Sequence, residues 1–122
     1  MYTKKVLKHF ANPKNAGCMK DSSGVGEVGN VRCGDILRLY IKVKDNKIVD
    51  AKFKTYGCVA AIAASDMLCE MVKGKTLEEA EKITNRDIVN ALGDLPAVKT
   101  HCSILGSSAL KKAIEDYRKK NK

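Results

Sequence analysis

Aromatic and acidic residues are both scarce in this sequence. Its 122 residues include no tryptophan, two phenylalanines and four tyrosines, and 23 Lys and Arg stand against 14 Asp and Glu, a net charge of +9. The basic excess suggests an acidic partner, such as nucleic acid, an anionic membrane or an acidic protein surface. The aromatic residues do not alternate with the lysines as a single-strand binding platform requires, so we expect no nucleic-acid ligand.

Long apolar stretches, internal repeats and low-complexity linkers are also missing. The apolar stretch Val59–Ala64 is far shorter than the roughly 18 residues that suggest a membrane span. The N-terminal residues Met1–Lys5 lead to His9 and Pro13 without the apolar segment of a secretory signal. We therefore expect a single domain over residues 1–122, no membrane partner and a cytoplasmic location.

The hydrophobic pattern predicts strands first and helices afterwards. Alternation of apolar and polar side chains indicates strands at 36–43 and 48–55, joined by a turn at Asp45–Asn46. Residues 14–30, rich in Gly, Ser and Asn, are expected to form loop and a weak edge strand. The expected fold is α+β: a small three-stranded antiparallel sheet with helices packed on one face.

Capping residues and apolar spacing define the helices. We predict helices at 3–10, at 59–73 before Gly74, from a capping box at Thr76 to about Ile83, and at 85–93 with Asn85 as cap. The last helix places Leu110, Ala113, Ile114 and Tyr117 on one face. His9 is expected on the surface of the first helix or as a cap. Gly24–Gly29 matches G-x-G-x-x-G, but polar residues precede it and a loop is expected after it, so nucleotide binding is not expected.

Five cysteines are an odd number, which argues against a closed disulfide framework and favours metal ligation or thiol chemistry in a reducing compartment. Three of them lie at joints between predicted elements. Cys33 precedes the first clear strand, Cys58 lies between a strand and the Ala-rich helix, and Cys102 lies near the start of the last helix. Helix N-termini favour the thiolate, which is the ligating form.

Two further donors accompany these thiols. Asp35 can face the same side as Cys33 in extended backbone, and His101 adjoins Cys102. This ligand set suits zinc or an iron–sulfur cluster equally, although any single cysteine is more often a packing residue. Cys69 fits that packing interpretation, and Cys18 is given no role.

Several segments, each near an element joint, together resemble the IscU/NifU-type iron–sulfur cluster assembly scaffolds, the NifU N-terminal domain family. They are His9–Pro13, Asn30–Asp35, Phe53–Cys58, Leu95–Lys99 and His101–Leu105. The resemblance implies that Cys33, Cys58 and Cys102 are cluster ligands and that Asp35 or His101 is the fourth. It also implies that Cys102 is the main persulfide acceptor.

The implied activity is that of a scaffold rather than an enzyme. A labile [2Fe–2S] cluster is built from iron and the persulfide sulfur of an IscS/NifS-type cysteine desulfurase, and is then passed to apo iron–sulfur acceptor proteins. Zinc is a candidate ligand of the cluster-free form. A chaperone would read the loop Leu95–Lys99, in which Ala97 replaces the second proline of the family motif and leaves this partner open. The alternative is a zinc-binding, SufU-like sulfur acceptor.

Overall fold

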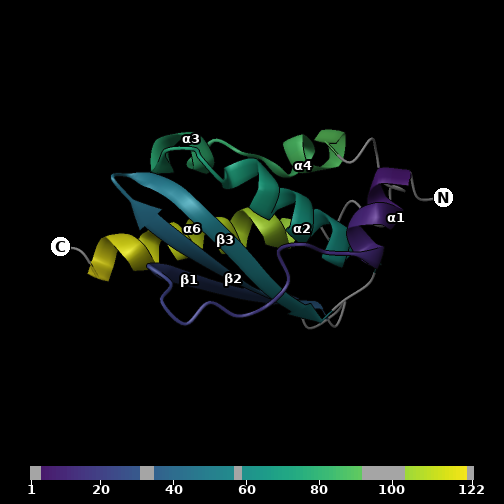
Figure 1. The fold of residues 1–122 in the computed structure, drawn as a ribbon, viewed down its shortest axis with the longest axis horizontal. Coiled ribbons are helices and arrows are strands. Elements are labelled where there is room, and N and C mark those ends of the chain that lie inside the picture. Colours follow the sequence, from purple (N-terminus) through teal and green to yellow (C-terminus); the bar gives the residue numbers. More distant parts are fainter. Residues whose placement is uncertain (1–3, 31–34, 57–58, 92–103, 121–122) are drawn as a thin grey trace.

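The computed structural model describes residues 4–30, 35–56, 59–91 and 104–120. A short helix is followed by three strands and then by further helices (Figure 1). The elements are α1 (Lys4–Ala11), β1 (Gly24–Asn30), β2 (Asp35–Lys44), β3 (Lys47–Tyr56), α2 (Val59–Val72), α3 (Leu77–Glu81), α4 (Asn85–Ala91) and α6 (Ile104–Lys120). Within these ranges, no helix is both long and apolar enough to cross a membrane.

The three strands form one antiparallel sheet in the order β1-β2-β3. The β2–β3 hairpin turns at Asp45 and Asn46, whose φ angles of 53° and 63° lie in the left-handed region that these two residue types tolerate. The alternating pattern places Leu37, Leu39 and Ile41 on the buried face. The predicted three-stranded sheet and its turn are therefore confirmed.

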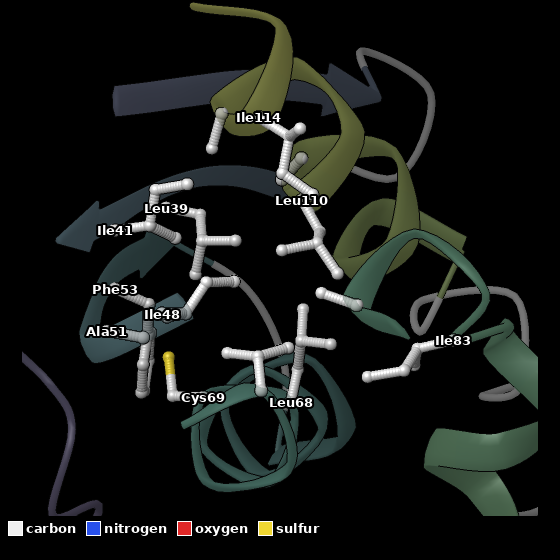
Figure 2. Packing of buried hydrophobic residues seen from close by; sticks show 14 of the residues in the cluster. Leu39, Ile41, Ile48, Ala51, Phe53, Leu68, Cys69, Ile83, Leu110 and Ile114 are labelled. Atoms are coloured by element: carbon white, nitrogen blue, oxygen red, sulfur yellow. The ribbon is translucent and has the colours of Figure 1, made fainter. Parts of the chain in front are cut away.

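Helices α2 and α6 cover this buried face of the sheet. Figure 2 shows Leu39, Ile41, Ile48 and Phe53 of the sheet turned toward Leu68 and Cys69 of α2 and Leu110 and Ile114 of α6. All eight side chains are at most 2% exposed. Burial of a large apolar side chain is worth roughly 1.5–3 kcal/mol, so this layer is the main source of stability. The expected α+β fold is confirmed.

The edge strand β1 contributes backbone more than side chains to this packing. A Cβ atom on Gly24 would lie 2.3 Å from the carbonyl oxygen of Ala113 in α6. Residues 24–29, which match the nucleotide fingerprint in sequence, thus form a strand whose glycines let a helix approach closely. The expected edge strand is confirmed, and it pairs with β2 over its full length.

The short helices are fixed by side-chain caps. Thr76 caps α3 in a capping box with Glu79, as predicted. For α4 the predicted cap is wrong, because Asn85 is already within the helix. The preceding residue takes the role: the backbone N–H of Asp87 donates to Thr84 Oγ1 at 3.2 Å, and the N–H of Thr84 donates to Asp87 Oδ2 at 2.9 Å. Two backbone N–H groups at the helix start, those of Thr84 and Asp87, are satisfied in this way.

Candidate functional site

The sequence-predicted site residues lie at the margin of the described structure. Cys33, Cys58, His101 and Cys102 are outside the described residues. Asp35 is the first residue of β2, and the description of its position is limited to the backbone. Cys33, Cys58 and Cys102 are each two residues from a described end, namely Asp35, Tyr56 and Ile104.

Two of these ends are joined through the sheet. Asp35 pairs with Asn30, where β1 ends, and the adjacent Ile36 pairs with Tyr56, where β3 ends. The hydroxyl of Thr55 also donates to the carbonyl oxygen of Ile36 at 2.5 Å. The end of β1, the start of β2 and the end of β3 therefore meet at one end of the sheet, which is also the end from which the chain enters α2.

The third end, the start of α6, is directed to the same place by its packing on β1. Gly24 lies against Ala113, and Gly26 lies against Ala109. Advancing along β1 toward Asn30 thus corresponds to moving back along α6 toward Ile104. In Figure 1 the C-terminal end of α6 accordingly lies on the opposite side of the molecule from the end of β3.

Large apolar side chains are exposed at this end of the sheet. Tyr56 is 65% exposed and Ile36 is 46% exposed. Beside them an apolar cavity of about 450 Å³ is lined by residues that include Cys18, Phe53, Thr55 and Ile62. Exposed apolar groups next to a hollow are typical of a surface that another molecule covers.

The two cysteines outside the predicted site behave differently from each other. Cys69 is fully buried in the core, and burial, reinforced by the nearby Asp66 carboxylate, raises the pKa of its thiol. It is a packing residue, as predicted. Cys18 is exposed, and the Tyr40 hydroxyl contacts its sulfur at 3.7 Å.

The structure also brings together a group that the sequence interpretation missed. His9 is not a free surface or capping residue, because its Nδ1 atom lies 2.5 Å from Oδ2 of Asp66 in α2. Asp66 is 1% exposed, and its Oδ1 accepts from the backbone N–H of Asn15 at 2.9 Å. The available signal was Asp66, a carboxylate among the mostly apolar residues of the stretch Val59–Cys69, since a buried carboxylate requires partners.

This network explains how α1 is held. Two apolar side chains of α1 are largely uncovered, with Leu7 48% and Phe10 39% exposed. Polar links connect α1 and the segment after it to α2. The Asn15 side-chain N–H also donates to Asp66 Oδ1 at 3.0 Å, and the Lys73 ammonium donates to the Asn15 side-chain oxygen Oδ1.

Comparison with known proteins agrees with this architecture. The family model for the NifU-like N-terminal domain matches residues 1–122. The chain belongs to this family. It is 58% identical over 121 residues to iron–sulfur cluster assembly scaffold protein IscU 1 of Archaeoglobus fulgidus, covering 99% of this chain and 79% of that protein.

Other members of the NifU-like N-terminal domain family differ in length. The IscU scaffold protein of Haemophilus influenzae is 54% identical over 98% of this chain and 97% of its own. The nitrogen fixation protein NifU of Nostoc sp. is 50% identical over 96% of this chain but only 42% of its own length. The match therefore spans nearly a whole IscU protein and less than half of a NifU protein.

Solved structures show the same fold. A crystal structure described as a proposed iron–sulfur cluster assembly scaffold for the SUF system, from Fervidobacterium islandicum, superposes with a TM-score of 0.75 at 26% identity, over 93% of this chain and 96% of that one. The N-terminal part of a NifU-like protein from Brucella abortus gives 0.76 at 19% identity, over 97% and 94%. The latter likeness concerns the fold alone.

Proposed function

We propose that this protein is a scaffold on which a labile [2Fe–2S] cluster is assembled and from which it is transferred to apo-proteins. The observation that carries the proposal is nearly full-length similarity, at 58% and 54% identity, to proteins named as IscU scaffolds. The strand pairing supports it independently. Asn30 pairs with Asp35 and Ile36 pairs with Tyr56, so the chain leaves the sheet toward two of the proposed ligands at one place.

In this proposal Cys33, Cys58 and Cys102 hold the cluster, and Asp35 or His101 completes its ligand set. Clusters in electron carriers are usually held by four thiolates. A carboxylate or imidazole is harder than a thiolate and is more easily protonated or displaced. One weak ligand among four therefore favours release of the cluster, which suits a donor.

Sulfur would enter through Cys102, close to the start of α6. The Cys102 thiolate attacks the outer sulfur of the desulfurase persulfide, the sulfur–sulfur bond of the donor breaks, and the donor cysteine leaves as a thiolate. Converting two such sulfur atoms to sulfide takes four electrons. Two ferrous ions becoming ferric supply two, and an external one-electron or dithiol reductant must supply the rest.

The proposed partners are a cysteine desulfurase and apo iron–sulfur proteins, with a chaperone at Leu95–Lys99 left open. Lys111 and Lys119 of α6 are exposed, and such cations steer an acidic partner surface into contact. We also propose that the chain acts as one domain in the cytoplasm. Core residues from the sheet, α2, α3, α4 and α6 form one cluster. An odd number of cysteines, of which Cys18 and Cys69 are free, suits a reducing compartment.

Anaerobic reconstitution with iron, cysteine and a desulfurase tests the assignment. We expect a coloured species with about two iron atoms per site, the composition of a [2Fe–2S] cluster. Cys33→Ser, Cys58→Ser and Cys102→Ser should each abolish stable colour, whereas Cys18→Ser, at an exposed thiol, is the matched control and should retain it. Colour that survives all three site substitutions contradicts the proposal.

The alternative candidate is a zinc-holding, SufU-like sulfur acceptor, although the SUF-system protein of similar fold is itself described as a cluster assembly scaffold. Such an acceptor would contain about one zinc as isolated, and its thiols would gain sulfur even when no cluster can form. Zinc that iron cannot replace, together with a persulfide visible by mass spectrometry, would favour this candidate over the scaffold.

A further inference from the structure

Three metal-ligating side chains converge between α1 and α2. His9 comes from the last turn of α1, and Asp66 and Glu70 come from α2. One ligand atom from each lies within 4.8 Å of the other two. Asp66 and Glu70 are four residues apart in a helix and thus share a face, which is the spacing that lets one helix supply two ligands to one ion.

Asp66 is the fixed member of this group. Its Oδ1 atom accepts from the backbone N–H and the side-chain N–H of Asn15 at 2.9 and 3.0 Å. Its Oδ2 atom is left for His9, at 2.5 Å. Since the side chain is 1% exposed, the carboxylate is held in one orientation by a buried network, as the ligands of metal sites are.

The three side chains line an actual cavity rather than a flat surface. Its volume is about 120 Å³, and Lys8, Asn12 and Lys14 complete its lining. A water molecule occupies roughly 30 Å³ in the liquid, so an ion with some of its water fits. Glu70 is exposed, which leaves an open route from solvent.

We propose that His9, Asp66 and Glu70 bind a divalent transition-metal ion, separate from the cysteine site. One imidazole nitrogen and two carboxylate oxygens suit Zn²⁺, Fe²⁺ or Mn²⁺, and three protein ligands leave positions for water. The set contains no sulfur donor, so it does not hold an iron–sulfur cluster. A bound ion would link α1 to α2 in place of the direct contact between His9 and Asp66.

The two lysines of the cavity bear on how tightly an ion is held. The cavity is lined by two lysines, Lys8 and Lys14, as well as by the two carboxylates. Repulsion by the lysines lowers the affinity for a cation. The site is therefore one for exchangeable metal, and removal of a lysine charge should strengthen binding. An anion held by the same lysines would respond in the opposite way.

The chain has only two histidines, His9 and His101, which permits a selective test. A chain with Cys33→Ser, Cys58→Ser, Cys102→Ser and His101→Asn lacks the three thiols and the imidazole proposed for the cluster site, of which only Asp35 is kept, and it has His9 as its sole histidine. Zn²⁺ is titrated at low ionic strength while the His9 imidazole signals are followed by NMR. We expect a saturable shift at one equivalent, and a result here does not depend on the scaffold function.

Single changes in this background locate the ion. Glu70→Gln should weaken Zn²⁺ binding at least about tenfold, and Lys8→Gln should strengthen it. Glu115→Gln, at an exposed glutamate on α6, is the matched control and should have no effect. Three results would each overturn the proposal. They are His9 signals that do not shift, equal Zn²⁺ affinity of Glu70→Gln and its parent, and weaker Zn²⁺ binding by Lys8→Gln.

A second measurement uses the otherwise unsubstituted chain, in case the multiple variant does not fold. Equilibrium dialysis against Zn²⁺ gives the number of ions bound per chain. At a free Zn²⁺ concentration near the dissociation constant of Glu115→Gln, Glu70→Gln should bind clearly less Zn²⁺ per chain than Glu115→Gln. Equal numbers for the two variants would show that His9, Asp66 and Glu70 form only a hydrogen-bonded link between helices.

Discussion

The carbonyl oxygen of Ala109 lies only 2.1 Å from the position that a Cβ atom on Gly26 would occupy. Strand β1 and helix α6 thus pack backbone against backbone at this point, and no side chain can be accommodated between them. The contact also orients α6, since it fixes which end of the helix lies near the end of β1. The position of the proposed persulfide acceptor therefore depends on a glycine far from it in sequence.

Gly26→Ala should destabilise the protein by about 3 kcal/mol, because a new methyl group must displace backbone rather than a flexible side chain. Urea unfolding followed by circular dichroism measures the effect. Gly106→Ala is the matched control. Its Cβ would lie 3.3 Å from Ile88 Cδ1 and Leu68 Cδ2, which can move, and helix propensity favours alanine by about 1 kcal/mol. Equal losses for the two variants would contradict this account.

Asp116 connects α6 to β1 through its carboxylate. The backbone N–H of Val25 donates to its Oδ2 at 2.9 Å, and this bond, with Lys120 at 3.0 Å, lowers the pKa of Asp116. A carboxyl whose pKa is lowered on folding adds stability above its unfolded pKa, and this stability is lost as the pH falls through the folded value.

Asp116→Asn keeps an acceptor for Val25 but loses the charge, so we expect it to cost about 0.5–1 kcal/mol at pH 7. The difference from the parent should shrink as the pH falls below about 4, where Asp116 of the unfolded chain becomes protonated, and it is lost once the pH is below the lowered pKa of the folded state. Denaturant unfolding at pH 7 and pH 3 measures this. Glu115→Gln, at the neighbouring exposed position, should show no loss of stability and no dependence on pH. A loss of stability in Asp116→Asn that does not change with pH would exclude the electrostatic explanation.

Cys18 and Cys69 should differ in reactivity. Burial raises the pKa of the Cys69 thiol, so it is both inaccessible and un-ionised, whereas Cys18 is exposed. In a chain with the three site cysteines replaced by serine, iodoacetamide should label Cys18 in the native state and Cys69 only after unfolding. Mass spectrometry identifies the labelled residue. Equal native-state labelling rates would show that the core around Cys69 opens readily.

Two neighbouring residues, Thr84 and Asn85, are the alternatives for the N-terminal cap of α4. Thr84 exchanges hydrogen bonds with Asp87, so Thr84→Ala should cost about 1 kcal/mol. Asn85→Ala should have little effect or be slightly stabilising, since Asn85 is within the helix and alanine has the higher helix propensity. Thermal or urea unfolding of both variants measures the loss of stability. A larger loss for Asn85→Ala than for Thr84→Ala would show that Asn85 caps the helix, as the sequence predicted.

Asp35→Ala tests the weak-ligand part of the scaffold proposal. If Asp35 is the displaceable ligand or gate, the variant should lose its cluster more slowly, and transfer to an apo-ferredoxin, followed by absorbance, should be slower than in the parent. Unchanged or faster transfer would count against this role and would favour His101 as the fourth ligand.

Periodic side chains made much of the fold predictable. The alternation in 36–43 and 48–55 identified β2 and β3, and spacing within α2 identified Cys69 as a packing residue, now found fully buried. Less could be predicted where glycine replaces side chains. In β1, three glycines leave no apolar alternation, so only a weak edge strand somewhere in 14–30 was expected, and its bounds follow from its pairing with β2 and from the helix that lies on it.

The contact between His9 and Asp66 could not be predicted, because it joins residues 57 positions apart and depends on how two helices pack. The exposure of Leu7 and Phe10 could not be predicted for a related reason, since helical spacing indicates a shared face but not whether another element covers it. The convergence of Cys33, Cys58 and Cys102 on one site remains a prediction, now supported by where the adjoining strands and helix end.

The dependence of β1 on α6 has a consequence for biosynthesis. Residues 24–30 leave the ribosome before the β2–β3 hairpin and α2, whereas residues 104–120 leave it after them. The hairpin of β2 and β3 can pair and collapse with α2 while translation continues. A glycine-rich edge has too few side chains to stay docked on that hairpin by itself, so the first strand is secured only after residues 104–120 have been synthesised and α6 has folded onto it.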